Sequence, residues 1–378
     1  MPGTSLTETY DAVLTTTLRN MQPTLRDNIT RSNKLLAYLE MRGRMRTITG
    51  GERIKVTLMY GLNNGADIYQ GYGNLSVQPQ DGITSAFFPW AQLSVPITIS
   101  GLEADIQNVG DSAVMDLLTA KITQSENSGK QLLNNCIVMG RLSSGATGNR
   151  NQFVSRTGKM DNSAAGPLPL PALVDANASR SVAIGSINGA NEAWWRNQVV
   201  AFSGSTFAAY KSLKNRLYNT CARGTMGNPD LILSDQYVWE LYMNSLSSQE
   251  RYIVTDPRVI DVLGGIGEDM LKFRGAIHIW DEMVPDVGTT TATQETESGL
   301  GDSVGTPLAT GANGTEFHLN SRAMEYVVAS RRNWTQTPFV RPENQDARVA
   351  QLLWAGQVCL NNRRKHGVMY DIDNSIAA

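Results

Sequence analysis

The feature that most constrains this chain is one helical pattern of about thirty residues, from Asp111 to about Gly140. Its apolar residues recur on one side at helical spacing, namely Val114, Leu117, Leu118, Ile122, Leu132, Leu133 and Cys136. At a rise of ~1.5 Å per residue the helix would run ~40 Å, so we expect a spine rather than an ordinary domain helix. Ser125 and Gly129 interrupt the stripe midway, where the helix could bend as a hinge or another element could pack closely.

The chain has 378 residues, which is enough for two lobes with appendages. With 41% hydrophobic and 18% charged residues it can bury a substantial core, and no apolar run is long enough to span a membrane. The formal net charge of −2 supplies no overall attraction to nucleic acid. The three cysteines, Cys136, Cys221 and Cys359, are far apart and odd in number, which predicts buried free thiols in a reducing cytoplasm.

The N-terminal part is predicted to be an arm. Residues 7–20 favour a short helix that Pro23 ends, and residues 24–42 favour a second one with a narrow face of Leu25, Ile29, Ser32, Leu36 and Leu39. So thin a stripe buries little against its own chain, so we expect the arm to lie along a larger surface. Basic residues outnumber Asp27 and Glu40 here: Arg19, Arg26, Arg31, Lys34, Arg42, Arg44 and Arg46. They could contact nucleic acid or acidic patches on neighbouring copies of the chain.

A two-stranded excursion follows Gly50-Gly51. Residues 52–60 alternate Ile54, Val56, Leu58 and Tyr60 with Arg53, Lys55, Thr57 and Met59, which predicts a strand. A returning strand is expected at 91–99. Between them, residues 61–90 are rich in Gly, Asn, Gln and Tyr and hold few aliphatic side chains for a core of their own. Such an excursion is marginal alone and needs a neighbour to lie on.

Residues 143–178 are rich in Gly, Ser, Asn and Pro and are predicted to connect two lobes. In the second lobe we expect helices at 206–223 and 235–249, the latter with Ser234 as its N-cap, and a short buried strand at 229–234. Further strand patterns lie at 276–280, 315–319, 326–330 and 336–340, whereas 347–361 could be strand or helix. The Gly- and Thr-rich residues 289–314 predict an exposed loop.

No catalytic or metal-binding motif emerges from the sequence. His278, His318 and His366 have no ligand-type residue at usable spacing, and Gly204-Ser205 lacks the context of a nucleophile elbow. The Gly-rich run at 264–269 has neither the Lys-Ser/Thr ending nor the preceding strand of a phosphate-binding loop. We therefore predict no enzyme activity, no cofactor and no metal ion.

Two large aromatic residues, Trp194 and Trp195, stand next to each other. Adjacent residues cannot share one face of a helix. We therefore expect one ring to pack inside and the other to meet a partner or a loop.

The order of these parts is similar to that of the major capsid proteins of tailed double-stranded-DNA bacteriophages, over essentially the whole chain. The most specific stretch is Pro229-Asp-Leu-Ile-Leu-Ser234, a helix with Tyr237 and Leu241, then Leu271-Lys-Phe-Arg-Gly275, Ile279, Asp281 and Pro285. It resembles the A-domain signature of that family, in which an F-x-G turn leads into a strand and then a D-x-x-x-P-like end.

The resemblance implies an α+β protein with a Hong Kong 97-like capsid fold. It implies an N-arm at 1–42, an extended E-loop with flanking strands at 43–105 and a P-domain with the spine helix at 106–165. An A-domain at 166–325 would follow, and residues 326–378 would supply closing P-domain strands and a C-terminal A-domain segment.

The function that the resemblance implies is structural. Hexamers and pentamers of the chain would form the icosahedral head of a virion, assembled in the host bacterial cytoplasm. The implied partners are other copies of the chain, a scaffolding protein in trans, a portal protein, a decoration protein and packaged double-stranded DNA at the inner surface, with no membrane. The alternative is another virion component, such as a tube or decoration protein, although these are usually smaller and all-β.

The arm and the E-loop supply the residues expected at contacts between subunits: Leu25, Ile29, Leu36, Arg42, Arg44, Ile54, Lys55, Val56, Leu58, Tyr69, Tyr72 and Trp90. We expect Ile54, Val56 and Leu58 to become buried when the E-loop lies across a neighbour's spine helix. Some relatives are cross-linked through a Lys and an Asn; Lys55 lies in the E-loop, but the sequence does not identify the partners that a cross-link requires.

Overall fold

The structure is a computed structural model that describes residues 34–73, 79–101, 117–138, 167–176, 183–246, 271–281, 283–284, 314–343 and 345–372. The chain divides into two compact units. The smaller holds Met1–Thr30, Val95–Ser128 and Gln336–Leu352, and the larger holds Arg31–Ser94, Gly129–Thr335 and Leu353–Ala378. The predictions for 7–20 and 264–269 lie outside the described residues, as does the loop predicted at 289–314 except for its last residue, Gly314, which is a buried strand residue. None of the helices in the described ranges is long and apolar enough to cross a bilayer.

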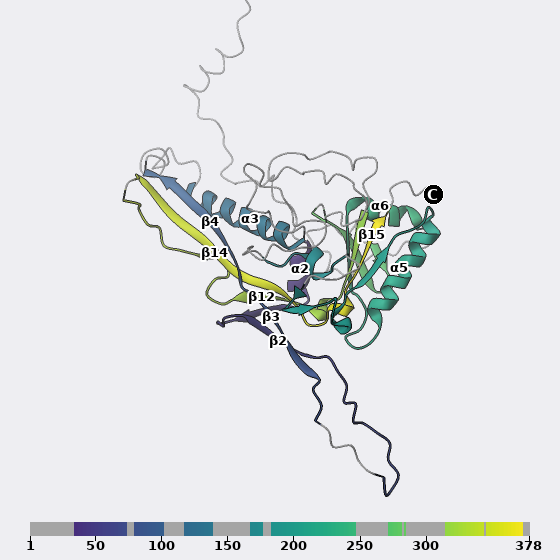
Figure 1. Cartoon of the computed structure of the whole chain (residues 1–378). Coiled ribbons are helices and arrows are strands. Elements are labelled where there is room, and N and C mark those ends of the chain that lie inside the picture. Colours follow the sequence, from purple (N-terminus) through teal and green to yellow (C-terminus); the bar gives the residue numbers. More distant parts are fainter. Residues whose placement is uncertain are drawn as a thin grey trace, which may run out of the picture. The chain divides into compact units, whose positions relative to one another are not determined.

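A six-stranded mixed sheet belongs to the larger unit (Figure 1). Its strands lie in the order β7 (Gln198–Ala201), β15 (Gly367–Ile372), β11 (Gly314–Leu319), β8 (Leu231–Ser234), β10 (Ala276–Trp280) and β9 (Leu271–Phe273). The pairs β7–β15 and β8–β10 are parallel, and the other three are antiparallel. This confirms the strands predicted at 229–234, 276–280 and 315–319.

Strand alternation decides what each face of this sheet carries. One face contributes Leu231, Leu233, Ile277, Ile279, Phe317, Leu319 and Val368 to one core cluster. The intervening Ile232, Ala276 and Met369 join a second cluster with residues of α5 (Phe207–Ala222) and α6 (Gln236–Ser245), two helices that pack on the sheet. His278, Glu316 and His318 occupy these same alternate positions, so they face the helices.

Each of these helices begins at a side-chain cap. Thr206 Oγ1 accepts a hydrogen bond from the Ala209 amide at 3.3 Å, and the Asp235 carboxylate accepts one from the Val238 amide at 2.7 Å. The prediction that Ser234 caps α6 was wrong, because Ser234 is the last residue of β8. Both helices otherwise lie within the predicted ranges.

The predicted F-x-G turn joins β9 to β10. Phe273 pairs with Ala276, which leaves Arg274 and Gly275 as a two-residue turn. Arg274 adopts a φ of +57°, a left-handed conformation that a tight hairpin requires. The turn therefore leads directly into a strand, as the sequence signature implies.

The second sheet has five strands. Their order is β1 (Met45–Ile48), β12 (Met324–Ala329), β14 (Ala347–Leu360) and β13 (Thr335–Gln336), and β4 (Ala91–Ser100) also pairs with β14. Residues 347–361, for which strand and helix were both open, therefore form a strand. The strand predicted at 336–340 is shorter, with β13 followed by an isolated bridge from Val340 to Val349.

In the larger unit, helix α2 (Lys34–Met41) packs on β12 and buries Leu35, Leu36, Tyr38 and Leu39. On the same sheet, Trp354 stacks on Tyr326 with 6.2 Å between ring centroids, and its Nε1 donates to the Tyr326 hydroxyl at 3.0 Å. The C-terminal part of the predicted arm helix is thus a core element of its own chain.

Helix α3 (Leu117–Val138) confirms the long helix predicted from Asp111 to about Gly140 over the part that the structure describes. It continues without a break through Ser125 and Gly129. The Ser125 hydroxyl donates to the Lys121 carbonyl at 2.8 Å, so this polar group is satisfied within the helix itself. In the larger unit, Leu133, Ile137 and Val138 of this helix join the core.

Strand β2 (Ile54–Met59) pairs antiparallel with β3 (Ile83–Phe88), from Ile54 opposite Phe88 to Met59 opposite Ile83. The prediction that 91–99 returns beside 52–60 was wrong, because that segment is β4 of the five-stranded sheet. The partner of β2 is β3, which lies inside residues 61–90. This segment has few aliphatic residues, but so short a strand needs only Ala86 and Phe88 to fill its inner face.

The described part of the segment predicted to connect two lobes is buried. Residues 167–176 carry the short helix α4 (Leu170–Leu173), and Leu168, Leu170 and Leu173 belong to the core. The carbonyls of Ala172 and Leu173 accept hydrogen bonds from the guanidinium of buried Arg363. Small elements complete the described chain: β5 (Ala183–Ile184), β6 (Ile187–Asn188) and the 3-10 turns η3 (Ala193–Trp195), η5 (Ser321–Ala323) and η6 (Arg363–Lys365).

Candidate functional site

The β2–β3 hairpin has an inner face that is filled by its own chain. Ile54, Leu58, Ala86 and Phe88 are all buried in the core of the larger unit, and Val56 packs against them. The expectation that Ile54 and Leu58 become buried only against a neighbouring subunit is therefore wrong. Period-2 alternation correctly placed these residues on one face, but it could not say whose core they would meet.

The hairpin is tied to its own unit at its base. The Phe87 amide donates to the Gly185 carbonyl at 2.9 Å, and a Cβ at Gly185, whose φ is +65°, would lie only 2.8 Å from the Ala86 side chain. The Tyr60 ring stacks on Trp194 with 5.4 Å between centroids. Trp195 is buried and donates to the Ile184 carbonyl at 3.0 Å. One tryptophan thus packs inside and the other meets a loop, as predicted.

Beyond this base, the chain exposes apolar side chains. The exposed fractions are 75% for Met59, 83% for Leu62, 99% for Ile68, 62% for Tyr69 and 68% for Ile83, and Tyr72 is fully exposed. All of them lie on the outer face of the hairpin or in the segment that joins β2 to β3. Each large apolar side chain gains about 1.5–3 kcal/mol on full burial, so these exposed residues are the candidates for contact with another molecule.

The remaining predicted contact residues are distributed between the core and the surface. Leu36 is buried, Arg44 is half-buried, and Arg42 is exposed with its Nε donating to the Tyr38 hydroxyl at 3.1 Å. Lys55 is exposed on the outer face of β2, and half-buried Trp90 donates to the Gly51 carbonyl at 2.8 Å. Leu25 and Ile29 lie outside the described residues.

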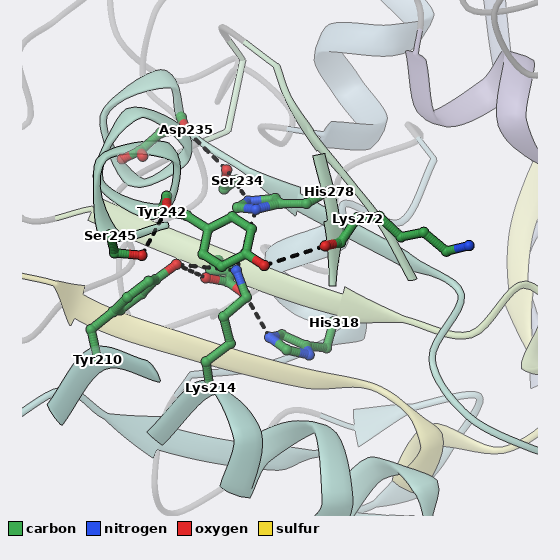
Figure 2. Close-up of polar contacts among 10 residues, drawn as sticks. Tyr210, Lys214, Ser234, Asp235, Tyr242, Ser245, Lys272, His278 and His318 are labelled. Atoms are coloured by element: carbon green, nitrogen blue, oxygen red, sulfur yellow. Dashed lines mark hydrogen bonds and ion pairs between the residues drawn. The ribbon is translucent and has the colours of Figure 1, made fainter. Parts of the chain in front are cut away.

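A polar network lies between the six-stranded sheet and its two helices, and sequence reasoning did not find it. Figure 2 shows Lys214 from α5 pointing toward strands β10 and β11, beside His278 and His318. Lys214 Nζ lies 3.1 Å from Glu316 Oε1, 3.3 Å from His278 Nδ1 and 3.2 Å from the Tyr210 hydroxyl. The sequence contained one signal of this network: His278, Glu316 and His318 occupy alternate positions of the buried strands β10 and β11.

Three further hydrogen bonds connect the network and bring in His318 and Ser234. His318 Nε2 lies 2.7 Å from Glu316 Oε1, the Tyr210 hydroxyl donates to Glu316 Oε2 at 2.7 Å, and Ser234 Oγ lies 2.9 Å from His278 Nε2 (Figure 2). The aromatic ring of Tyr242 lies 3.9 Å from Lys214 Nζ and adds a cation–π contact. Ion pair, imidazoles and rings therefore form one connected cluster.

The electrostatics of the cluster follow from burial. Burial lowers the pKa of Lys214 to about 8, against the opposing effect of Glu316. Burial alone would raise the pKa of Glu316, but Lys214 and His318 hold it well below its ordinary value. The pKa of His278 is well below that of a free histidine, because of burial and then the Lys214 charge.

Perturbed side chains of this kind often mark active sites. Here, however, the side chains of Lys214, Glu316, His278 and His318 are all completely buried, so no substrate reaches them. Within the described ranges, no three His, Cys, Asp or Glu side chains are grouped in a way that could hold a metal ion. The network therefore serves the folded state, and the apolar surface of the hairpin is the candidate functional site.

Comparison with known proteins places the fold. No protein-family model and no curated protein sequence matches the chain. Among solved structures it is similar to a capsid subunit of cyanophage A-1(L), with a TM-score of 0.60, 14% identity and coverage of 94% of this chain and 96% of the other. It is also similar to the capsid of an empty GTA particle, with a TM-score of 0.56, 10% identity and coverage of 94% and 95%.

A third similar structure is the SrpI encapsulin of Synechococcus elongatus, with a TM-score of 0.53, 9% identity and coverage of 97% of this chain and 96% of the other. At such identities the likeness concerns the fold. The chain has the α+β capsid fold, as the sequence resemblance implied, and it has that fold over nearly its whole length.

Proposed function

We propose that this chain is the major capsid protein of a tailed bacteriophage, which self-assembles as hexamers and pentamers into an icosahedral head around double-stranded DNA. The observation that carries the proposal is the capsid fold over 94% of the chain, combined with an exposed apolar hairpin. Enzymatic chemistry is not part of the proposed function, since the perturbed side chains of the network are sealed from solvent.

The proposed roles of the parts follow the capsid fold. Residues 43–105, which contain the β2–β3 hairpin, would be the E-loop, and residues 106–165, with α3, would be the P-domain spine. Residues 166–325, which contribute most of the six-stranded sheet, would be the A-domain. Residues 326–378 would close both domains, and residues 1–42 would be the N-arm.

In the proposed mechanism of assembly, copies of the chain bury apolar surface against one another. A stable interface covers ~1,600 Å² in total, and a shell subunit needs several such contacts on different sides. Different patches that meet head to tail close into rings, and five-fold and six-fold rings require only small rotations between neighbours. The outer face of the hairpin, with Met59 and Ile83, and the aromatic segment around Tyr69 and Tyr72 would be buried against the next copy.

Further partners belong to the same proposal. We expect a scaffolding protein in trans during assembly in the bacterial cytoplasm and a portal protein in the head, and a decoration protein can cover its outside. Packaged DNA would lie at the inner surface.

The likeness to the SrpI encapsulin supports a second candidate, a shell that encloses protein cargo. The contents of particles purified from the source cells separate the two: nuclease-protected DNA supports the phage head, whereas a protein cargo without DNA would support the second.

The proposal is tested by deleting residues 62–80. The deletion joins Gly61 to Asp81 beside the hydrogen bond from the Tyr60 amide to the Gly82 carbonyl (2.9 Å), so a two-residue turn can close the hairpin. The inner face of β2 and β3 is untouched, so we expect a folded subunit with normal circular dichroism that forms no closed shells. Electron microscopy of the protein co-expressed with its scaffold is the measurement.

A milder pair of variants controls for the deletion. Tyr69→Ser with Tyr72→Ser removes two exposed rings, whereas Asp67→Ser with Gln70→Ser changes two exposed polar residues of the same segment. We expect the yield of shells to fall for the first pair and to stay normal for the second. Normal shells from the deletion variant would contradict the role of the hairpin, and tubes from the unmodified chain would contradict the head.

A further inference from the structure

All three histidines of the chain lie in or beside one sheet. His278 is in β10, His318 is in β11, and His366 directly precedes β15. Each is completely buried. Since the sequence holds no other histidine, any titration of histidine character in this protein belongs to the six-stranded sheet.

The hydrogen bonds determine the protonation state of His278. The Lys214 ammonium has three protons and no lone pair, and its three neighbours are Glu316 Oε1, the Tyr210 hydroxyl and His278 Nδ1. His278 Nδ1 must therefore accept, which makes this imidazole neutral with its proton on Nε2. That proton is directed to Ser234 Oγ, whose own proton is directed to the Asp235 carbonyl at 3.0 Å.

Both carboxylate oxygens of Glu316 also accept hydrogen bonds. Its Oε1 accepts from Lys214 and His318 Nε2, and its Oε2 accepts from Tyr210. His318 Nδ1 is buried and has no hydrogen-bond partner among the described residues. An additional proton would have to displace the Lys214 bond at His278, remove an acceptor at Glu316, or stand without a partner at His318 Nδ1. Each outcome breaks a bond or buries an unpaired charge.

We propose that this network is an acid-sensitive latch, which holds helices α5 and α6 on the six-stranded sheet only while His278 and His318 are uncharged. The groups that face the two imidazoles come from every element packed against them: Tyr210 and Lys214 from α5, Tyr242 from α6, Ser234 from β8 and Glu316 from β11. Tyr218 of α5 also lies edge-on to His318, under the Arg274 guanidinium. This inference does not depend on the proposed function.

The direction of the pH dependence follows from linkage. Burial lowers the pKa of both His278 and His318, and it lowers the pKa of His366 to about 4. Below pH ~6.5 the unfolded chain therefore binds protons that the folded chain does not, and the folded state loses stability as the pH falls toward the folded pKa values. Glu316 adds a further loss below pH ~4.5, since its pKa is also lowered in the fold.

Lys214 acts in the same direction. Its pKa of about 8 means that the unfolded chain binds more protons between pH 8 and ~10.5, so stability rises with pH there too. By contrast, no histidine lies in the described part of the five-stranded sheet. The acid response is therefore expected to originate in one sheet.

The test measures urea unfolding of the full-length dissociated subunit between pH 7.5 and 5.0. We expect the folding equilibrium constant to fall by up to about tenfold per pH unit for each neutral histidine below pH 6.5. The variant His278→Asn with His318→Asn should show a clearly shallower slope, whatever its absolute stability. The control Tyr242→Phe keeps the ring that faces Lys214 and removes the hydroxyl that donates to the Lys272 carbonyl (3.3 Å), and it should retain the full slope.

A second measurement uses the unmodified chain and does not require the variants to fold. Hydrogen exchange at the imidazole C2 position, followed by mass spectrometry, reports the pKa of each histidine separately. We expect His278 and His318 to titrate well below 6.5 in the folded subunit. The proposal is overturned if both titrate near 6.5 in the folded state, or if the double variant unfolds with the same pH slope as the unmodified protein.

Discussion

The interior of the six-stranded sheet and the outer side of the β2–β3 hairpin reverse the usual distribution of side chains. In the first, a lysine, a glutamate and two histidines are completely buried; in the second, isoleucine, leucine, methionine and tyrosine face solvent. Both arrangements cost free energy unless each group finds a partner. Inside the sheet the partners are present in the same chain, at hydrogen-bonding distances. The exposed apolar side chains of the hairpin, by contrast, do not pack into the core of this chain.

This difference separates residues that make the subunit from residues that make the assembly. Substitutions in the network should change folding, whereas substitutions on the outer face of the hairpin should change association and leave folding almost untouched.

Removing the buried lysine should destabilise the subunit most. Lys214→Met leaves Glu316 charged, buried and deprived of one of its donors. Loss of one partner of a buried ion pair costs about 3–5 kcal/mol, so the urea midpoint should fall markedly. Arg216→Met, at an exposed position of the same helix, should change the free energy of unfolding by no more than about 0.5 kcal/mol. Equal changes in the free energy of unfolding for the two substitutions would contradict a stabilising role of the network.

Two neighbouring residues of β2 provide the sharpest contrast between the faces of the hairpin. Leu58 is buried and Met59 is exposed. Leu58→Ala should lower the free energy of unfolding by about 2–5 kcal/mol, because it opens a cavity in the core. Met59→Ala should leave subunit stability within about 0.5 kcal/mol and reduce the yield of shells. A stable, assembly-defective Leu58→Ala variant would show that the two faces have been assigned wrongly.

At the base of the hairpin we expect a smaller change in the free energy of unfolding, because a single aromatic contact is involved. The stack of Tyr60 on Trp194 should contribute about 0.5–1.5 kcal/mol beyond simple burial. A double-mutant cycle of Tyr60→Leu and Trp194→Leu, measured by urea unfolding of the subunit, isolates this coupling. A coupling energy near zero would mean that the hairpin is anchored by β2, β3 and Gly185 alone.

Local patterns predicted the elements that depend on short-range rules. The helices α3, α5 and α6 and the buried strand β8 were expected from periodicity and end signals, whereas the F-x-G turn was expected from the family resemblance. The predictions that failed concern partners. Residues 91–99 do form a strand, but β4 pairs with β14, about 250 residues further along the chain, rather than with β2. Ser234 is the last residue of a strand, and the neighbouring Asp235 caps the helix by accepting a hydrogen bond from the Val238 amide.

Propensity and hydrophobic period act over a few residues, so most helices and strands, the alternation of their faces and the capsid-like order of the parts could be predicted from the sequence. That Ile54 and Leu58 belong to their own core, and that Lys214 contacts Glu316, 102 residues away, could be learned only from the folded chain. These outcomes depend on contacts between distant segments, and a period of two or 3.6 residues carries no information about which distant surface a face will meet.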